Sequence, residues 1–189
     1  MEILFIRHGH GEHLLEYPNR LNTLHLDLTE YGKHQILQLR DQLTLRPDDV
    51  ILASPTKRTM RSAEVLLGHT NFYVSPLIGP RMFPQHPDFP FLLCDRIYTR
   101  EEILEKKQDA AILDFGLDLW GEGINRIELE QFESLGKRFL DWCCARGKRA
   151  VLISHDGTIT SYRVLLGEKG LTRDHFLGEA GTYVAQYGE

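Results

Sequence analysis

Two arginines and two histidines in this 189-residue chain stand just after short apolar runs: Arg7, His8, Arg58 and His155. A neutral imidazole is a nucleophile near neutral pH. The planar guanidinium group of arginine matches the oxygens of a phosphate group. If the four side chains meet, one histidine can attack phosphorus while the other histidine and the arginines neutralise charge on the phosphoryl group. The residue types therefore indicate phosphoryl-transfer chemistry.

Apolar runs that alternate with helical patterns would position these residues. The sequence predicts buried strands at residues 2–6, 50–53 and 150–154, a weaker strand at 72–74 and a final strand at 182–187. It predicts helices at about 29–46, 54–68, 132–147 and 158–166. This alternation predicts an α/β fold, a three-layer sandwich whose mostly parallel central sheet has helices on both faces. The carboxyl ends of parallel strands lie along one edge of a sheet, so the four side chains can converge there.

Local signals predict where the helices begin. Thr29 is a plausible N-cap. Ser54 and Pro55 are favoured at the N-cap and first helical positions, so a helix is predicted to begin there and to end at Gly68. Arg58 then falls in the first turn. Because helical side chains lean toward the N-terminus of their helix, its guanidinium group can point back to the strand edge.

A proline-rich segment interrupts the alternation: residues 76–98 contain Pro76, Pro80, Pro84, Pro87 and Pro90. This density excludes a regular helix or a central strand, so we expect a long surface loop. With a predicted helix near 100–107, residues 76–126 would form a loop or cap on a single domain spanning 1–189. Four apolar side chains either pack beneath this loop or form a lid that favours an apolar leaving group: Phe83, Phe89, Phe91 and Leu92.

Composition narrows the classes of function. The net charge of -5, from 22 basic and 27 acidic residues, argues against a general nucleic-acid binder. We expect no membrane partner, since no apolar run approaches the ~20 residues of a membrane span, and we expect no signal peptide. Three cysteines without CxxC spacing indicate reduced thiols and a cytoplasmic setting. His8, His10 and His13 match no standard zinc spacing, so we expect no metal and no cofactor.

Four short motifs resemble, in order and context, those of the histidine phosphatase superfamily, also called phosphoglycerate mutase-like. They are Arg7-His8-Gly9, residues 28–32 (LTEYG) followed by Gln35, residues 54–58 (SPTKR), and Ser154-His155-Asp156-Gly157. The resemblance covers residues 3 to about 166 and implies a phosphoglycerate mutase-like fold. It also implies that His8 becomes the phosphohistidine, that Arg7, Arg58 and His155 complete the phosphate pocket, and that no metal is needed.

The chain departs from that family in two respects. Many members carry a glutamate acid after the second motif, but here the equivalent residues 76–83 hold no carboxylate. Another branch uses an aspartate directly after the second histidine, here Asp156, which could equally be a helix cap. Asp95 and Asp88 in the proline-rich loop are the other candidates, and the sequence does not decide between the two favoured ones, Asp156 and Asp95. The family's glycolytic mutases are also longer, with segments that shield the phosphoenzyme, so the shorter chain favours attack by water.

The sequence thus predicts a metal-independent phosphatase of the histidine acid type, which hydrolyses a small phosphate monoester through a phosphohistidine on His8. One alternative is a phosphomutase of the phosphoglycerate mutase type. The other is a non-catalytic module that binds a phospholigand or a phosphoprotein, although a binder need not keep a nucleophile. The identity of the small phosphorylated substrate and the oligomeric state stay open.

Overall fold

A six-stranded sheet forms the centre of the molecule in the computed structural model, which describes residues 1–86, 88–108 and 110–188. The strand order is β4-β3-β2-β5-β1-β6. Neighbouring strands run parallel except β6, which pairs antiparallel with β1. The strands are β1 (Glu2–Arg7), β2 (Val50–Ala53), β3 (Tyr73–Val74), β4 (Ala111–Ile112), β5 (Arg149–Ser154) and β6 (Thr182–Gln186).

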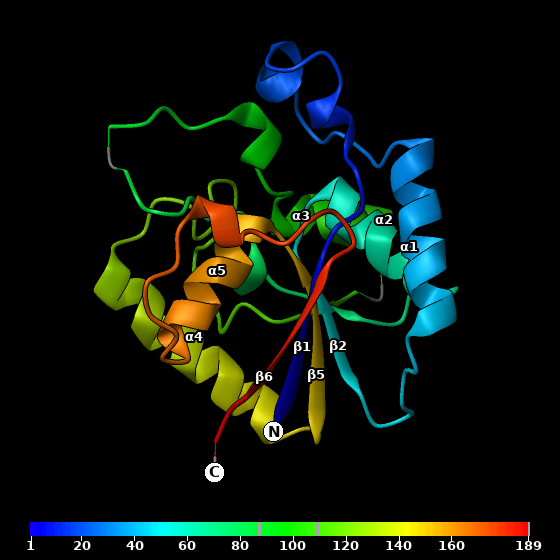
Figure 1. The fold of residues 1–189 in the computed structure, drawn as a ribbon, viewed down its shortest axis with the longest axis vertical. Helices are drawn as coiled ribbons and strands as arrows, with labels where there is room; N and C mark the ends of the chain where they lie inside the picture. The colour runs from blue at the N-terminus through cyan, green and yellow to red at the C-terminus, as the bar shows by residue number, and fades with distance from the viewer. Residues whose placement is uncertain (87, 109, 189) are drawn as a thin grey trace.

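Helices cover both faces of the sheet, which confirms the predicted three-layer α/β sandwich (Figure 1). One face carries α1 (Glu30–Gln42), α2 (Lys57–Leu67) and α3 (Arg100–Lys106), and the other carries α4 (Leu129–Cys144) and α5 (Asp156–Leu165). No helix of the described residues is both long and apolar enough to cross a membrane.

Alternating side chains of the strands build two separate cores, one on each face. In β1, Ile3 and Phe5 pack with α4 and α5, whereas Leu4 and Ile6 pack with α1 and α2. All four side chains are almost completely buried. A strand buried on both faces reads as a continuous apolar run, which is why the sequence pattern located β1 and β5.

The polar motifs all lie at one end of the sheet. The segments that follow β1, β2 and β5 leave the sheet at its carboxyl edge, while both chain termini lie at the opposite end (Figure 1). Ser154 and Thr158 also hold the start of the proline-rich segment at this edge, because their hydroxyl groups donate to the carbonyl oxygens of Ile78 (2.7 Å) and Gly79 (2.6 Å).

The predicted start of α2 at Ser54-Pro55 is wrong: the helix begins at Lys57, after Thr56 as N-cap. The Ser54 amide still belongs to the sheet, since it donates to the carbonyl oxygen of Ile153 (3.0 Å). Gly68 ends the helix in the left-handed region, at φ 72°, as predicted. Arg58 remains in the first turn, so the reason given for its direction still holds.

Two other helix starts were also predicted. Thr29 is the N-cap of α1, as predicted, and its hydroxyl group accepts from the Gly32 amide (3.0 Å). Helix α5 begins two residues earlier than the predicted Thr158, with His155 as N-cap. Asp156 is therefore the first helical residue and not the cap, although its carboxylate accepts from the Gly157 amide (2.6 Å).

The proline-rich segment is irregular, as predicted, with two short 3-10 turns at Pro76–Ile78 and Leu93–Asp95. Pro87 lies outside the described residues. Helix α3 occupies the predicted position, whereas the short strand β4 was not predicted. The two residues of β4 are too few to show a periodic pattern.

Candidate active site

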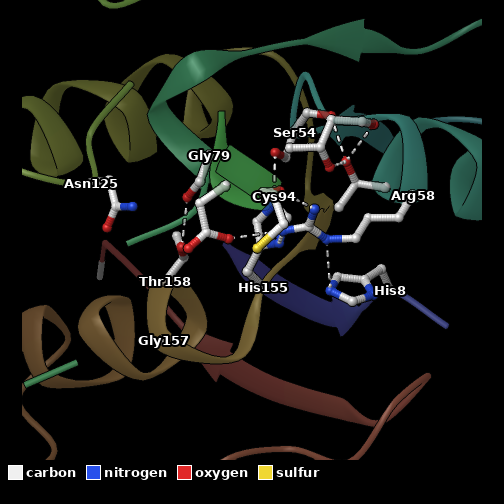
Figure 2. A network of polar contacts seen from close by, with 12 residues as sticks. His8, Ser54, Arg58, Gly79, Cys94, Asn125, His155, Gly157 and Thr158 are labelled. Atoms are coloured by element: carbon white, nitrogen blue, oxygen red, sulfur yellow. Dashed lines mark hydrogen bonds and ion pairs between the residues drawn. The ribbon is translucent and has the colours of Figure 1, made fainter. Parts of the chain in front are cut away.

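Arg58 connects the groups at the carboxyl edge of the sheet. Its Nε donates to His8 Nε2 (3.3 Å), and its Nη2 lies 3.2 Å from His155 Nδ1. Its Nη1 donates to the carbonyl oxygen of Cys94 (2.6 Å), while Nη2 also reaches Asp95 Oδ1 (3.2 Å). Figure 2 shows the Arg58 side chain reaching from α2 toward His8, Cys94 and His155. Arg58 is buried, so its charge acts on its neighbours with little screening.

The ring of His8 is held with one nitrogen available to react. Its Nδ1 lies 2.7 Å from the carbonyl oxygen of Gly9, which can only accept, so Nδ1 carries the proton. The Nε2 atom is then the unprotonated nitrogen, and it accepts from Arg58. This is the tautomer that a nucleophile attacking through Nε2 requires.

His155 lies beside His8, with 5.2 Å between the ring centroids. The ring stands between two polar groups, since its Nε2 is 2.9 Å from the hydroxyl oxygen of Ser54 and its Nδ1 faces Arg58. Ser54 therefore orients the second histidine instead of capping α2. Arg58 can only donate, so a neutral His155 accepts at Nδ1 and donates from Nε2 to Ser54.

Arg7 completes the group from the end of β1. Its Nη2 lies 3.1 Å from Asp156 Oδ2 and 3.4 Å from Glu179 Oε1, and its Nη1 donates to the carbonyl oxygen of Leu177. Asp156 and Glu179 partly balance the charge of Arg7, and both are partly exposed. All four residues predicted from the sequence thus lie in one region of the structure.

Two of the unsatisfied polar groups of the protein belong to this region. Among the residues that the structure describes, four buried side-chain atoms lack a hydrogen-bond partner: Arg7 Nε, His13 Nδ1, His25 Nδ1 and Arg81 Nη2. A buried donor without a partner costs about 1–3 kcal/mol. Arg7 Nε is always a donor, so an anion at this position would remove that cost.

Burial and the local charges both favour the neutral form of the two histidines. Burial, followed by the charge of Arg58, lowers the pKa of His8 well below 6.5. The same two causes, in the same order, lower the pKa of His155. A nucleophilic nitrogen must be unprotonated, so this environment suits nucleophilic attack by His8.

Three aspartates were candidates for the acid, and they lie in different environments in the structure. Asp95 contacts Arg58, and burial raises the pKa of its carboxyl group, with the nearby Asp156 acting in the same direction. Asp156 pairs with Arg7. Asp88 is exposed, and no described contact joins it to the four residues of the pocket.

The proline-rich segment approaches the site through Asp95. A small cavity beside Asp95 is lined by Phe89, Phe91 and Leu92 of this segment, while Phe83 packs against Phe176 with 6.4 Å between ring centroids. Phe83 thus makes an internal packing contact, and the role of the other three side chains as a lid for an apolar leaving group stays a prediction.

Sequence reasoning missed Ser54 as a partner of His155, Glu179 as a partner of Arg7, and the proximity of His13 to His8. The signal for His13 was present, since it lies in the same loop, but its spacing was tested only against zinc motifs. The described residues contain no group of three or more histidine, cysteine or acidic side chains placed to hold a metal ion. Burial raises the pKa of the Cys94 thiol to about 12, so it is a poor nucleophile.

The fold and the four pocket residues resemble those of the histidine phosphatase superfamily. Residues 3–82, which include Arg7, His8 and Arg58, match the model of the histidine phosphatase superfamily (branch 1), and this confirms the resemblance seen in the motifs. His155 lies outside the matched residues. A search of curated protein sequences finds no significant match.

Solved structures share the fold along nearly the whole chain. A putative alpha-ribazole-5'-P phosphatase from Escherichia coli is 16% identical, with a TM-score of 0.57 over 100% of this chain and 92% of its own. A mutant phosphoserine phosphatase from Entamoeba histolytica, in complex with phosphoserine, is 20% identical, with a TM-score of 0.60 over 97% and 89%. A phosphoglycerate mutase from Thermus thermophilus is 20% identical, with a TM-score of 0.56 over 99% and 94%. At these identities the likeness establishes the fold alone.

Proposed function

We propose that this protein hydrolyses a small phosphate monoester through a phosphohistidine on His8. One observation carries the proposal: the Nε2 atom of a buried, neutral His8 faces Arg58, because Nδ1 is fixed by the carbonyl oxygen of Gly9. A nucleophilic nitrogen beside a guanidinium group is the arrangement that an in-line attack on phosphorus needs.

In the first step, His8 Nε2 attacks phosphorus and the bond from phosphorus to the ester oxygen breaks. Arg7 and Arg58 donate hydrogen bonds to the phosphoryl oxygens, whose charge is greatest in the transition state. For this, Arg58 Nε exchanges its acceptor on His8 for a phosphoryl oxygen. His155 joins them as a donor once the bound dianion has drawn a proton from solvent onto its ring. The leaving alkoxide takes a proton from a carboxylic acid and departs as the alcohol.

Asp95 is the stronger candidate for that acid. An acid must hold its proton near the working pH, and burial raises the pKa of Asp95. Both carboxyl groups contact an arginine, Asp156 with Arg7 (3.1 Å) and Asp95 with Arg58 (3.2 Å). The choice of Asp95 therefore depends on the burial that raises its pKa against the charge of Arg58.

In the second step, water attacks the phosphohistidine. The Asp95 carboxylate takes a proton from the water as its oxygen bonds to phosphorus, and the bond between nitrogen and phosphorus breaks. His8 returns to the neutral tautomer and inorganic phosphate is released. Asp95 is again protonated, so the cycle closes without a metal or another cofactor.

The activity can be tested with para-nitrophenyl phosphate and the variant His8→Ala. We expect the wild-type protein to hydrolyse this ester and to carry an acid-labile phosphoryl group on His8, detected by mass spectrometry after rapid quenching. His8→Ala should lose both, while His34→Ala, on the exposed face of α1, should keep both. A His8→Ala rate above roughly a tenth of the wild-type rate would contradict the assignment of the nucleophile.

The same experiment separates the alternatives. A phosphomutase would transfer the phosphoryl group between positions of its substrate and would require a bisphosphate primer. A binding module would bind the ester without forming the covalent adduct.

A further inference from the structure

His13 lies next to the nucleophile, although neither the motifs nor the proposed mechanism uses it. It belongs to a short 3-10 turn, Glu12–Leu14, in the loop that follows β1. Its ring meets the ring of His8 edge-on, with 5.7 Å between centroids. A side chain on Gly11 would collide with it, since a Cβ there would lie 2.5 Å from His13 Nδ1 and 3.4 Å from Arg58 Cδ. His13 thus packs against Gly11, beside the aliphatic part of Arg58.

Positive and neutral groups surround this ring. The groups whose interactions reach it are Arg7 at the end of β1, Arg58 on α2, His8 and His10 of its own segment, and His155 at the start of α5. Burial and the charges of the two arginines lower the pKa of His13 to about 3, with a smaller contribution from His10. No carboxylate is among the described groups that shift this pKa, although the neighbouring Glu12 carboxylate accepts from the Asp27 amide.

The Nδ1 atom of His13 is buried without a hydrogen-bond partner, like Nε of the adjacent Arg7. A histidine that served packing alone would place its apolar edge inward and satisfy its nitrogens, because an unpaired buried polar group is costly. An anion with several acceptor oxygens, bound near Arg7 and Arg58, would give a partner to Arg7 Nε and to a protonated His13 Nδ1. His25 has an unpaired Nδ1 too, but it stacks on Tyr98 at 4.1 Å and lies 3.9 Å from Glu102, away from the arginine pair.

We propose that His13 is a third imidazole of the phosphate pocket, which recognises dianionic phosphoryl groups by taking up a proton as they bind. The inference rests on the proposed function and adds a specificity to it. A dianion between Arg7 and Arg58 would be the first strong negative charge near His13. It would raise the pKa of the ring, since an opposite charge within a few ångströms favours the charged form. The proton comes from solvent and returns to solvent when phosphate leaves.

Proton uptake by His13 would select among substrates by their charge. A phosphate monoester dianion draws the proton onto His13 and gains a charge-assisted hydrogen bond from it. A phosphodiester or a sulfate ester carries only one negative charge and stabilises the imidazolium less. His8 stays neutral throughout, as its role as nucleophile requires.

Isothermal titration calorimetry with tungstate at neutral to slightly alkaline pH tests the proposal, since tungstate is a tetrahedral dianion under those conditions. Measured at one pH in two buffers of different ionisation enthalpy, the wild-type protein should take up protons on binding. His13→Gln should take up fewer and bind tungstate roughly 10- to 100-fold more weakly, the loss expected for a hydrogen bond to a charged group. His10→Gln is the matched control, because its ring contacts the Thr29 hydroxyl group (3.1 Å), and it should resemble the wild type.

Equal proton uptake by the wild-type protein and His13→Gln would overturn the inference. If His13→Gln does not fold, the wild-type His13 ring can be followed by NMR, and an imidazole that stays neutral when tungstate binds would overturn it equally. Failure of the proposed function looks different, because para-nitrophenyl phosphate would then remain intact while tungstate binding still depended on His13. Turnover that is unaffected by His13→Gln, with unchanged proton uptake, would remove this inference alone.

Discussion

At the scale of single residues, the site depends on Arg58 more than on any other side chain. The guanidinium group contacts both histidines, the Asp95 carboxylate and the Cys94 carbonyl oxygen. Its charge is also the second cause, after burial, of the lowered pKa of both His8 and His155. Under the proposed function, this one residue positions His8, adds to the burial that keeps it neutral, and offers donors to the phosphoryl group.

Arg58→Lys is a sharper test of this role than removal of the side chain. Lysine keeps the positive charge but cannot form the planar set of hydrogen bonds to several partners. We expect kcat/KM for para-nitrophenyl phosphate to fall by roughly 10²–10³-fold, the usual cost of losing a preorganised donor. Lys57→Ala, at the neighbouring position on α2, is the control. A loss below about fivefold in Arg58→Lys would mean that charge alone suffices.

The pH profile should reveal which carboxylate is the acid. Activity needs neutral His8 and is lost as pH falls through the pKa of His8, which burial and Arg58 hold well below 6.5. Activity also needs protonated Asp95 and is lost as pH rises through the pKa of Asp95, which burial raises above 3.8. We therefore expect an acidic optimum for alkyl phosphates.

Asp95→Asn should remove the alkaline limb of kcat/KM and slow alkyl phosphates far more than para-nitrophenyl phosphate, whose leaving group needs no proton. Asp156→Asn is the matched comparison and should keep that limb. The opposite pattern would assign the acid to Asp156.

At the scale of secondary-structure elements, the sequence predicted the features that depend on residues close together in the chain. The apolar runs and caps predicted β1, β5 and α1, and the strand-end positions predicted that Arg7, His8, Arg58 and His155 would converge. The start of α2 could not be predicted, because Ser54 makes long-range contacts with Ile153 and His155 in place of a local cap. The contact of Asp95 with Arg58 joins residues 37 positions apart through an irregular loop, for which no sequence period exists.

A close approach between α1 and the loop after β1 calls for glycine. A Cβ on Gly32 would lie 2.1 Å from the carbonyl oxygen of His10. In a helix, alanine is normally more stable than glycine by about 1 kcal/mol. Helix propensity alone therefore predicts that Gly32→Ala stabilises the protein. We expect Gly32→Ala to destabilise instead, by about 1–3 kcal/mol in urea unfolding, because the loop must move away from the helix. The displacement should also lower kcat/KM, since this loop holds His8.

His34→Ala, two residues further along α1 and exposed, should change neither quantity. A Gly32→Ala protein as stable and as active as the wild type would show that the loop and the helix adjust without cost.

At the scale of the whole molecule, the two ends of the sheet serve different purposes. The carboxyl edge gathers the pocket residues, whereas the amino edge is held by an ion pair at the start of β5. Arg149 donates to both carboxylate oxygens of Asp49, with Nε to Oδ1 at 2.7 Å, and also to the carbonyl oxygen of Thr44 (2.8 Å). Glu2, at the start of β1, lies 3.6 Å from the same guanidinium group. This network joins the beginnings of β1, β2 and β5 far from the pocket.

Arg149→Leu should therefore separate stability from activity. Removing one partner of a buried pair leaves the other charge without compensation, and we expect a loss of about 3 kcal/mol in the free energy of unfolding. Well below its melting temperature, the folded variant should hydrolyse para-nitrophenyl phosphate at the wild-type rate. Arg46→Leu, whose exposed side chain lies 3.6 Å from Glu2, is the control and should cost less than about 1 kcal/mol.

The pH dependence of that loss identifies its cause. Burial alone would raise the pKa of Asp49, but hydrogen bonds from Arg149 and the Arg46 amide outweigh it and hold the pKa below 3.8. A lowered carboxyl pKa contributes stability that is fully present above the unfolded value and disappears as pH falls through the folded value. The difference in the free energy of unfolding between the wild type and Arg149→Leu should accordingly stay constant from neutral pH to about pH 5 and decrease below pH 3.8. A gap that persisted undiminished under strong acid would mean that Arg149 stabilises the sheet through packing of its aliphatic stem and not through Asp49.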